Sequence, residues 1–595
     1  MCGIAGIYNF QNETPLVDTE ELTRIRDHMA VRGPDGKGLW LSNNKRCGLA
    51  HRRLAIIDLS NAGHQPMSTQ DGRFHISFNG EIYNYLALRA ELEQKGIIFQ
   101  SHSDTEVLLH LYRQENIAML PKLRGMFAFA IWDEQEQKLF LARDHFGIKP
   151  LYIADNGKTI RFASQVKALL AGGQIDTTPE PAGLVGFYLW GSIPEPYTRY
   201  KGIRALPVGS YLIIGRSGRC QQQSYFNLNK ALIAPSTSIT AIGKSDALEQ
   251  LHTALVDSVN HHLIADVPIG IFLSAGLDSS TLVALASEVE DRQLRTLTLG
   301  FKEYKGTVND ETILAEQVAD HYGTQHTTQW IQKQDFSDEY HNLLLAMDQP
   351  SIDGVNTYFI CKAAKDADLK VVLSGLGGDE LLGGYPSFTQ IPKMVKALKY
   401  FGVVPLLGKG FRLISAPILN HYTSPKYAGL LEYGSDYGGA YLLRRGLYMP
   451  WELPDLLDGD IVKQGWQELN ALSILKQTYT GIKNEQLKIS ALEMAHYMKN
   501  QLLRDTDWAS MAHSLEVRTP LIDIDLFKAI TLLAHANRPS SKTDMAISPY
   551  KQLPKAILNR PKSGFSIPVN EWLRNESSSI KSRGLRDWAK ILITD

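Results

Sequence analysis

The second residue of the chain is a cysteine, in the segment Met1-Cys2-Gly3-Ile4. Removal of Met1 would leave a thiol and a free α-amine on the same residue, so that nucleophile and base come as one unit. The amine has an ordinary pKa of about 7.7–8.0, against about 8.5 for a thiol, and can accept the thiol proton near neutral pH. Cys2 is therefore a candidate nucleophile, although most single cysteines are small buried packing residues.

Further motifs in the first half carry groups that hydrolysis of a free amino-acid amide requires. Such a substrate needs a cation for its α-carboxylate, an anion for its α-ammonium and donors for the tetrahedral oxyanion. Arg53 can supply the cation, and Asp104 with Glu81 can supply the anion. Asn79 and the Gly80 backbone N–H can supply the oxyanion donors. Each residue alone is more often part of a surface ion pair or a turn. Their combination with an N-terminal cysteine favours catalysis.

Two loops in the second half have the composition of phosphate-binding turns. The sequences are LSAGLDSS at residues 273–280 and LSGLGGDE at residues 373–380, and each follows an apolar strand. Backbone N–H groups and the positive end of a helix dipole collect anions at such positions. Neither loop has the lysine of a Walker A motif, but Asp278 can bind Mg²⁺ through oxygen. A single Gly/Ser loop after a strand often occurs by chance. Two such loops together predict a single nucleotide-binding site to which both contribute.

The elements that must position these residues divide the chain into two unlike halves. Residues 1–228 are rich in short apolar runs separated by turns, such as Asn156-Gly157, which predicts antiparallel sheets interrupted by helices at 84–94 and 105–112. Residues 229–243 are small and polar and are interpreted as a linker. Residues 244–595 begin with strand, glycine-rich turn and helix, which is typical of a doubly wound α/β domain.

Two shorter patterns complete the expected layout of the second half. A strand at 269–273 and a helix at 281–288 flank the first loop. In the C-terminal third, apolar residues recur at helical spacing, which predicts helices with buried faces. These residues are Leu492, Ala495, Met498 and Leu502.

The bulk properties fit a small-molecule enzyme. With 595 residues the chain is too long for a single hydrophobic core. Its formal net charge of -1 gives no field that would attract nucleic acid or an anionic membrane. The cysteines are scattered and predict neither disulfides nor a zinc site, and no segment has the pattern of a signal peptide or a membrane span. We expect a cytoplasmic protein without nucleic-acid or membrane partners.

The first half resembles the N-terminal-nucleophile (Ntn) glutaminases of the asparagine synthetase and amidophosphoribosyltransferase group. The match includes Cys2, the stretches RGPDG at 32–36 and NGEIYN at 79–84, and RDHFGIKPLY at 143–152. The resemblance implies a four-layer αββα sandwich with Cys2 as nucleophile and Asn79 and Gly80 as oxyanion hole. The glutamine-binding residues that it implies are Arg53, Leu54, Ile57, Asn79, Gly80, Glu81 and Asp104.

The second half resembles the ATP-pyrophosphatase synthetases, and the two halves together resemble the glutamine-hydrolysing asparagine synthetases over nearly the whole chain. The resemblance implies a doubly wound parallel fold with helical additions, Mg²⁺ on Asp278 and Asp379, a catalytic Lys562 and a homodimer. The ATP-binding residues that it implies are Leu273, Ser274, Gly276, Asp278, Ser279, Leu299, Ser374 and Gly375. The stretches 504–511 and 516–520 are interpreted as walls of the same cleft, with buried ion pairs between helices as the alternative.

Two positions depart from the family pattern. Ala275 replaces a glycine, which is a minor change if the residue keeps a negative φ. Leu376 stands where the pattern has a glutamate linked to the acceptor step, and a leucine can neither accept a proton nor bind ammonium. The stretch 353–357 is expected to meet the acceptor but does not identify it.

The leading hypothesis is synthesis of asparagine from aspartate, glutamine and ATP. A close rival uses the same machinery on another carboxylate, such as a sugar uronate or a peptide acid. A rival of a different class is a glutamine-binding regulatory protein with an inert second half, which Asp278, Asp379 and Lys562 argue against. The resemblance also covers β-lactam synthetases, but their first half lacks a working nucleophile.

Overall fold

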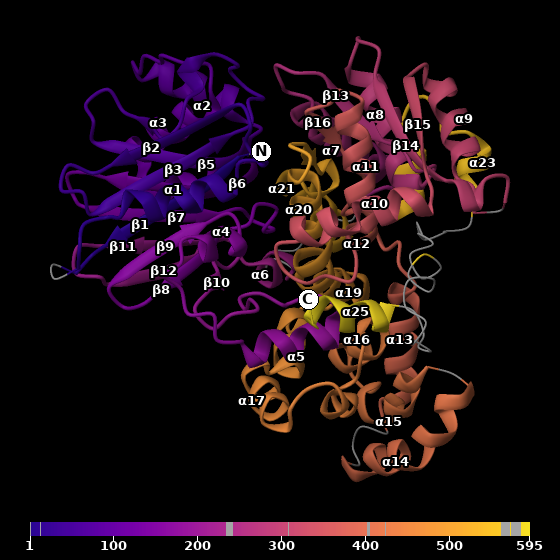
Figure 1. The fold of residues 1–595 in the computed structure, drawn as a ribbon. Helices are drawn as coiled ribbons and strands as arrows, with labels where there is room; N and C mark the ends of the chain where they lie inside the picture. Colours follow the sequence, from indigo (N-terminus) through magenta and orange to yellow (C-terminus); the bar gives the residue numbers. More distant parts are fainter. Residues whose placement is uncertain are drawn as a thin grey trace.

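The structure of the protein is a computed structural model that describes residues 2–11, 14–233, 242–307, 309–400, 405–422, 424–560, 572 and 585–594. Two antiparallel sheets form the first half (Figure 1). The first has the strand order β10 (Arg204–Ala205), β8 (Tyr152–Asp155), β9 (Thr159–Ala163), β1 (Gly3–Asn9), β3 (Cys47–Arg53), β2 (Gly36–Leu41). The second has the order β12 (Cys220–Ser224), β11 (Ser210–Ile214), β7 (Lys138–Arg143), β6 (Gly125–Asp133), β5 (Phe74–Ile82), β4 (Met67–Ser68).

The two sheets pack face to face through apolar side chains on alternate positions of their strands. Ile4 and Leu49 of the first sheet share a buried cluster with Trp132 and Leu141 of the second. The predicted Asn156-Gly157 turn joins β8 to β9, with Gly157 at φ +79°. The antiparallel sheets expected for this half are therefore present.

Helices cover the outer faces of both sheets. Their bounds in the first half are α1 (Thr19–His28), α2 (Tyr85–Gln94), α3 (Asp104–Glu115), α4 (Val166–Ala171), α5 (Pro181–Trp190) and α6 (Leu228–Leu232). α1 and α4 share a buried cluster with the first sheet, and α2 and α3 share one with the second. The predicted helices correspond to α2 and α3, whereas α1, α4, α5 and α6 were not predicted. α1 is mostly charged and buries only a short apolar face around Leu22 and Ile25.

The second half is built on a sheet in which all neighbouring strands are parallel. Its order is β15 (Gln325–Ile331), β14 (Arg295–Phe301), β13 (Ile269–Phe272), β16 (Val371–Leu373), β17 (Glu516–Arg518). The helices around it are α7 (Lys244–His262), α8 (Leu277–Val289), α9 (Thr312–Tyr322), α10 (Lys333–Ala346), α11 (Val355–Asp366) and α12 (Gly378–Leu382). The chain leaves β13 toward β14 and returns on its other side as β16. This reversal of strand order is the position where doubly wound sheets bind ligands.

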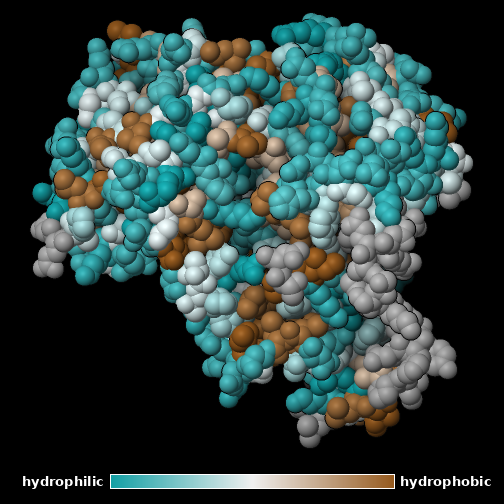
Figure 2. Space-filling view, in the orientation of Figure 1, coloured by the Kyte–Doolittle hydropathy of each residue, from teal (hydrophilic) through white to brown (hydrophobic). Residues whose placement is uncertain are grey.

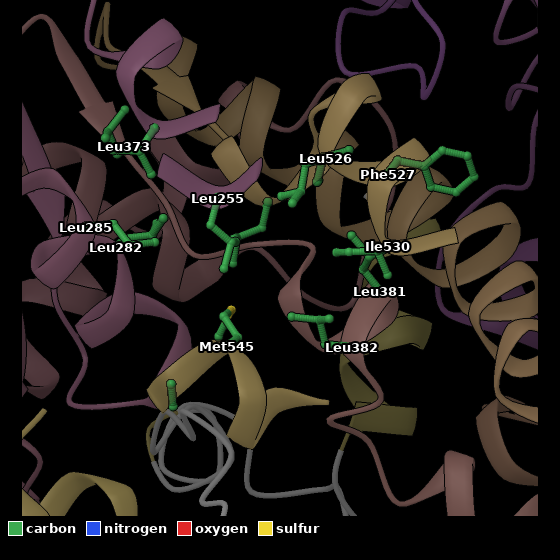
Figure 3. Packing of buried hydrophobic residues seen from close by; sticks show 14 of the residues in the cluster. Leu255, Leu282, Leu285, Leu373, Leu381, Leu382, Leu526, Phe527, Ile530 and Met545 are labelled. Carbon is green, nitrogen blue, oxygen red and sulfur yellow. The ribbon is translucent and has the colours of Figure 1, made fainter. Parts of the chain in front are cut away.

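Leucine, isoleucine and methionine side chains from several helices form the core beside this sheet. Figure 3 shows Leu255 of α7, Leu282 of α8, Leu381 of α12 and Ile530 of α21 (Ile524–His535) gathered in one buried cluster. Met545 of α22 (Lys542–Ile547) belongs to the same cluster. This core fixes the helices that carry the two loops of the predicted nucleotide site.

The C-terminal third is largely helical, as expected. Its further helices are α13 (Ser387–Leu398), α14 (Pro405–Tyr422), α15 (Leu430–Tyr433), α16 (Tyr437–Arg445), α17 (Gly459–Leu469), α18 (Ala471–Tyr479), α19 (Glu485–Leu492), α20 (Arg504–Met511), α23 (Lys555–Leu558) and α25 (Leu585–Thr594). Figure 1 shows α5 of the first half lying against α17, and the two share a buried cluster. Among the described residues, no helix combines the length and the apolarity needed to cross a bilayer.

A π-helical segment, Glu493–Leu503, links α19 to α20. The wider turn of a π-helix shifts the buried face away from the positions that α-helical spacing predicts. Leu492 and Met498 are buried as expected, but Ala495 and Leu502 are only half-buried.

Candidate active sites

Cys2 lies directly before β1, where the two sheets of the first half meet. Its backbone N–H donates to Asn79 Oδ1 at 3.0 Å, and its thiol Sγ lies 3.9 Å from the carbonyl oxygen of Leu54. The side chain is buried, and burial raises the pKa of the thiol. A base is therefore needed to form the thiolate.

Asn79 and Gly80 lie on β5, next to Cys2. Asn79 is fully buried, and its Nδ2 donor has no hydrogen-bond partner within the described part of the chain. Gly80 has φ +155°, and a Cβ added there would lie 2.0 Å from the carbonyl oxygen of Met126. The position therefore requires glycine. An unused buried donor beside the thiol is what an oxyanion hole requires.

Two carboxylates lie at the same end of β5. Asp104 opens α3 and accepts a hydrogen bond from Ile82 N at 3.0 Å. Burial raises the pKa of Asp104 to about 6, and the nearby carboxylate of Glu516 adds to the rise. Burial also raises the pKa of Glu81 well above its usual range, and Glu81 Oε1 lies 3.7 Å from Arg518 Nη2.

The remaining residues predicted to bind a substrate in this half follow the end of β3. The Arg53 guanidinium donates to the carbonyl oxygens of Ser60, at 2.8 Å, and Asp58. Leu54 contacts the thiol through its carbonyl oxygen, whereas Ile57 is buried in the adjoining core. Leu54 therefore contacts Cys2, whereas the Arg53 side chain is hydrogen-bonded to the loop that contains Asp58 and Ser60.

A buried ion pair joins this site to the second half of the chain. Arg32 Nη1 and Nη2 donate to Asp507 Oδ2 and Oδ1 at 2.7 and 3.0 Å, and Arg32 Nε donates to the Cys2 carbonyl oxygen at 3.2 Å. On β17, Arg518 Nε donates to Glu516 Oε1 at 2.7 Å. The sequence motifs did not predict that Arg32 would meet Asp507 or that Arg518 would lie beside Glu81.

The interpretation of these two stretches as cleft walls is correct for some residues and wrong for others. Thr506 and Val517 line a cavity beside the glycine-rich loops. Asp507, Glu516 and Arg518 form buried ion pairs directed at the first half instead. In a strand, neighbouring side chains point to opposite faces, which separates Val517 from the residues on either side.

The two glycine-rich loops meet where the strand order of the parallel sheet reverses. The first loop follows β13 and the second follows β16, and these strands are hydrogen-bonded neighbours. A cavity of about 180 Å³ opens between them. Of the predicted nucleotide-binding residues, it is lined by Leu273, Ser274, Leu299 and Ser374. The other predicted contacts, Gly276, Asp278, Ser279 and Gly375, lie in the adjoining loops and the first turn of α8.

A lysine that the sequence reading missed joins the two predicted metal ligands. Lys542 Nζ contacts Asp278 Oδ1 and lies 2.8 Å from Asp379 Oδ1. Burial opposes its charge, but both carboxylates together raise the pKa of Lys542. Lys542 begins α22 directly after the N-cap Ser541. A cation at a helix N-terminus is unfavourable. The lysine directly after the capping Ser541 was therefore the signal in the sequence that could have identified Lys542. Two carboxylates that converge on one cation are a donor set suited to Mg²⁺.

Three positions noted in the sequence have different outcomes. Ala275 adopts φ +52°, so the condition under which its substitution would be minor is not met, and the alanine bears the strain of a left-handed backbone. Leu376 lines the same cavity as Ser374. Lys562 lies outside the described residues.

The stretch expected to meet the acceptor separates two cavities. Asn356 and Thr357 line the cavity beside the glycine-rich loops. Asp353, Val355 and Asn356 line a second cavity of about 480 Å³. Asn356 thus belongs to both.

All four cysteines carry free thiols. Cys47 and Cys361 are buried, as expected of small packing residues. Cys220 is exposed on β12, an edge strand, so that expectation is wrong for this residue.

A buried thiol joined by ion pairs to a half whose glycine-rich loops border a cavity is the arrangement of a two-part amidotransferase. Models of known families match both halves: the glutamine amidotransferase domain matches residues 1–226, and the asparagine synthase model matches residues 250–591. The chain belongs to the asparagine synthase family of glutamine-hydrolysing enzymes.

Two named relatives match this chain over most of its length, and a third matches about two thirds of it. Asparagine synthetase [glutamine-hydrolyzing] 1 of Bacillus subtilis is 31% identical over 100% of this chain and 90% of its own. A putative asparagine synthetase of Mycobacterium tuberculosis is 30% identical over 93% of this chain and 85% of its own. Asparagine synthetase B of Escherichia coli is 32% identical over 66% of each chain.

Proposed function

We propose that this protein makes asparagine from aspartate, with glutamine as the nitrogen donor and ATP as the source of energy. The observation that carries the proposal is the presence, in one chain, of a buried Cys2–Asn79 pair and a nucleotide cavity flanked by Asp278 and Asp379. The named relatives are asparagine synthetases, which favours aspartate over another acceptor carboxylate.

In the first reaction, Cys2 attacks the side-chain amide carbon of glutamine. With Met1 removed, the α-amine of Cys2 takes the thiol proton and later gives it to the departing ammonia. Asn79 Nδ2 and the Gly80 N–H stabilise the oxyanion. Arg53 binds the α-carboxylate of glutamine, Asp104 and Glu81 bind its α-ammonium, and Leu54 and Ile57 contribute backbone contacts. Water then releases glutamate from the thioester.

In the second reaction, the acceptor carboxylate attacks the α-phosphorus of ATP. The cavity walls bind the adenosine end, and the loop N–H groups bind the phosphates. We assign ATP binding to Leu273, Ser274, Gly276, Asp278, Ser279, Leu299, Ser374 and Gly375. Asp278 and Asp379 would hold Mg²⁺, which supplies charge neutralisation for the departing pyrophosphate. Lys562 is assigned to the charge that develops on the phosphate and the carboxyl oxygens.

Several broader features belong to the same proposal. We assign the first half to the αββα layering of Ntn hydrolases, which the helices on both outer faces of its two sheets support. We propose domains at 1–228 and 244–595 with a linker at 229–243, a homodimer, and a cytoplasmic location.

AMP release tests the proposed function. With glutamine, ATP, Mg²⁺ and aspartate we expect AMP and asparagine in equal amounts, and only background AMP when aspartate is omitted. Ammonium chloride should replace glutamine as nitrogen donor. No aspartate-dependent AMP, together with turnover of another acid, would contradict the choice of aspartate. Absence of any ATP-dependent stabilisation against heat would instead favour an inert second half.

The raised pKa of Asp104 predicts a pH dependence for glutamine use. Below a pH of about 6 the carboxylate is protonated and cannot pair with the α-ammonium of glutamine, so kcat/KM for glutamine should fall about tenfold per pH unit. The measurement is kcat/KM of the glutaminase reaction as a function of pH, from about pH 5 to about pH 8. Asp104→Asn should raise KM at neutral pH and remove the part of the acidic limb that lies near pH 6, while the fall caused by protonation of the Cys2 α-amine remains. A flat wild-type profile through this range would exclude Asp104 as the ammonium-binding group.

A further inference from the structure

The cavity of about 480 Å³ lies beside the nucleotide cavity and is larger than the proposed reaction needs. It is bounded by the end of α5, the start of α11, α16, the π-helical segment and α25. Figure 1 shows α5, α16 and α25 close together, and Figure 2 shows apolar residues gathered over this part of the surface. Trp190 and Trp588 form part of its wall. Through Asn356, this cavity adjoins the loops where a carboxylate would be activated.

The volume of this cavity sets a scale for its occupant. Pockets of about 300–1,000 Å³ are typical of sites for drug-sized ligands. Aspartate is a four-carbon molecule and would leave most of the space unfilled. The aromatic and aliphatic lining favours an occupant that buries carbon as well as polar groups.

One wall offers a cationic group with an unused donor. The Arg445 guanidinium lies over the rings of Tyr385 and Tyr497, 4.3 and 3.9 Å from their centroids, and its Nε donates to Glu493 Oε2 at 3.0 Å. Its Nη2 is buried and has no hydrogen-bond partner among the described residues. A buried guanidinium N–H without a partner is suited to a carboxylate. Lys426, on the same cavity, adds a second cation.

Near Arg445 the cavity offers an anionic group. Asp353 Oδ1 accepts from Gly354 N at 2.9 Å, and Tyr497 also hydrogen-bonds its carboxylate. The same ring of Tyr497 stacks on Arg445. A cation and an anion held on one aromatic residue, at the wall of one cavity, match the carboxylate and the ammonium of an amino acid.

We propose that this cavity binds the body of an acidic amino acid larger than aspartate, and that the protein has the further activity of amidating its distal carboxylate. The inference rests on the synthetase chemistry of the proposed function. The distal carboxylate oxygen bonds to the α-phosphorus of ATP as pyrophosphate leaves, giving an acyl adenylate. Ammonia from glutamine then attacks the acyl carbon, AMP leaves, and the nitrogen loses a proton to give the carboxamide. Asp353 binds the ammonium, and Arg445 binds the remaining carboxylate.

An acceptor panel with the full-length enzyme tests this activity. AMP release is measured with glutamine, ATP and Mg²⁺ and one of aspartate, α-aminoadipate, adipate or galacturonate. We expect kcat/KM for α-aminoadipate to equal or exceed that for aspartate, and kcat/KM for adipate, which lacks the amine, to be at least about tenfold lower. If aspartate is a substrate and α-aminoadipate is not, this inference is wrong and the proposed function stands. If α-aminoadipate is a substrate and aspartate is not, the inference stands and the choice of aspartate in the proposed function is wrong. Turnover of galacturonate alone would overturn both.

Two variants link the activity to the cavity. Asp353→Asn should raise KM for α-aminoadipate at least about tenfold with a smaller effect on kcat, while Asp366→Asn, outside the cavity at the far end of the helix α11 that Asp353 precedes, should not. Leu585→Trp adds bulk at an exposed position of the lining and should lower the ratio of α-aminoadipate to aspartate kcat/KM about fivefold or more. Leu532→Trp, at an exposed leucine outside the cavity lining, is the control. An unchanged ratio in Leu585→Trp, with glutaminase activity retained, would overturn the assignment of this cavity.

Discussion

Replacing Cys2 with alanine should lower glutamine-dependent asparagine synthesis by at least about a thousandfold and leave ammonia-dependent synthesis within about twofold of wild type. The thiol is the proposed nucleophile of the first reaction and lies against the Leu54 carbonyl oxygen of its own half, while the Cys2 backbone N–H donates to Asn79. Ammonia supplied in solution bypasses that reaction. The two activities are measured as asparagine formed with either nitrogen source, and mass spectrometry of the active wild type should show that Met1 is absent.

Cys220→Ala is the matched control for this variant, because Cys220 is an exposed free thiol far from β1 in the sequence and at the edge of the second sheet. It should change neither activity. Loss of both activities in Cys2→Ala would mean that the two reactions do not have separate sites. Full glutamine-dependent activity in that variant, or in a form that retains Met1, would remove Cys2 from the mechanism.

Replacing Asp379 with asparagine should have the opposite effect and lower ammonia-dependent AMP release by at least about a hundredfold, with glutaminase turnover within about twofold of wild type. Asp379 and Asp278 converge on Lys542 Nζ, so the two carboxylates already hold a cation between them. The amide keeps the shape of the side chain but removes the charge that Mg²⁺ needs. AMP and glutamate, assayed separately, give the two activities.

A surface aspartate provides the comparison for this variant. Asp366→Asn changes an exposed carboxylate at the end of α11 and should leave both activities unchanged. Magnesium titration adds a second readout, because Asp379→Asn should require a higher Mg²⁺ concentration for half-maximal AMP release. Retention of AMP release at the wild-type Mg²⁺ requirement would exclude Asp379 as a metal ligand.

The sequence predicts those parts of the molecule whose chemistry is local. Cys2, Asn79 and the start of α3 can be grouped from the sequence because their motifs resemble those of the Ntn glutaminases. The strand-loop-helix units are recognisable because a strand, its glycine-rich turn and the following helix are consecutive in the chain. The parallel order of β13 and β16 follows from that repeated unit.

The features that the sequence does not predict are of two kinds. Some depend on contacts between residues far apart in the chain, and others on local backbone geometry that residue composition does not signal. Lys542 meets Asp278 only because α22 packs against α8. Ala275 has a positive φ that its residue type argues against. The π-helical segment displaces Ala495 from the buried face without any distinguishing residue. The short apolar face of α1 gives too weak a period to predict a helix.

The buried contact of Arg32 with Asp507 and with the Cys2 carbonyl has a consequence for evolution and for engineering. The backbone that carries the thiol is held by a side chain whose charge is neutralised from the other half of the polypeptide. A fragment ending near residue 228 would expose an uncompensated guanidinium at its catalytic end. Chimaeras that exchange one half with a relative would therefore have to exchange both members of this pair together, and the two halves are expected to have diverged as one unit.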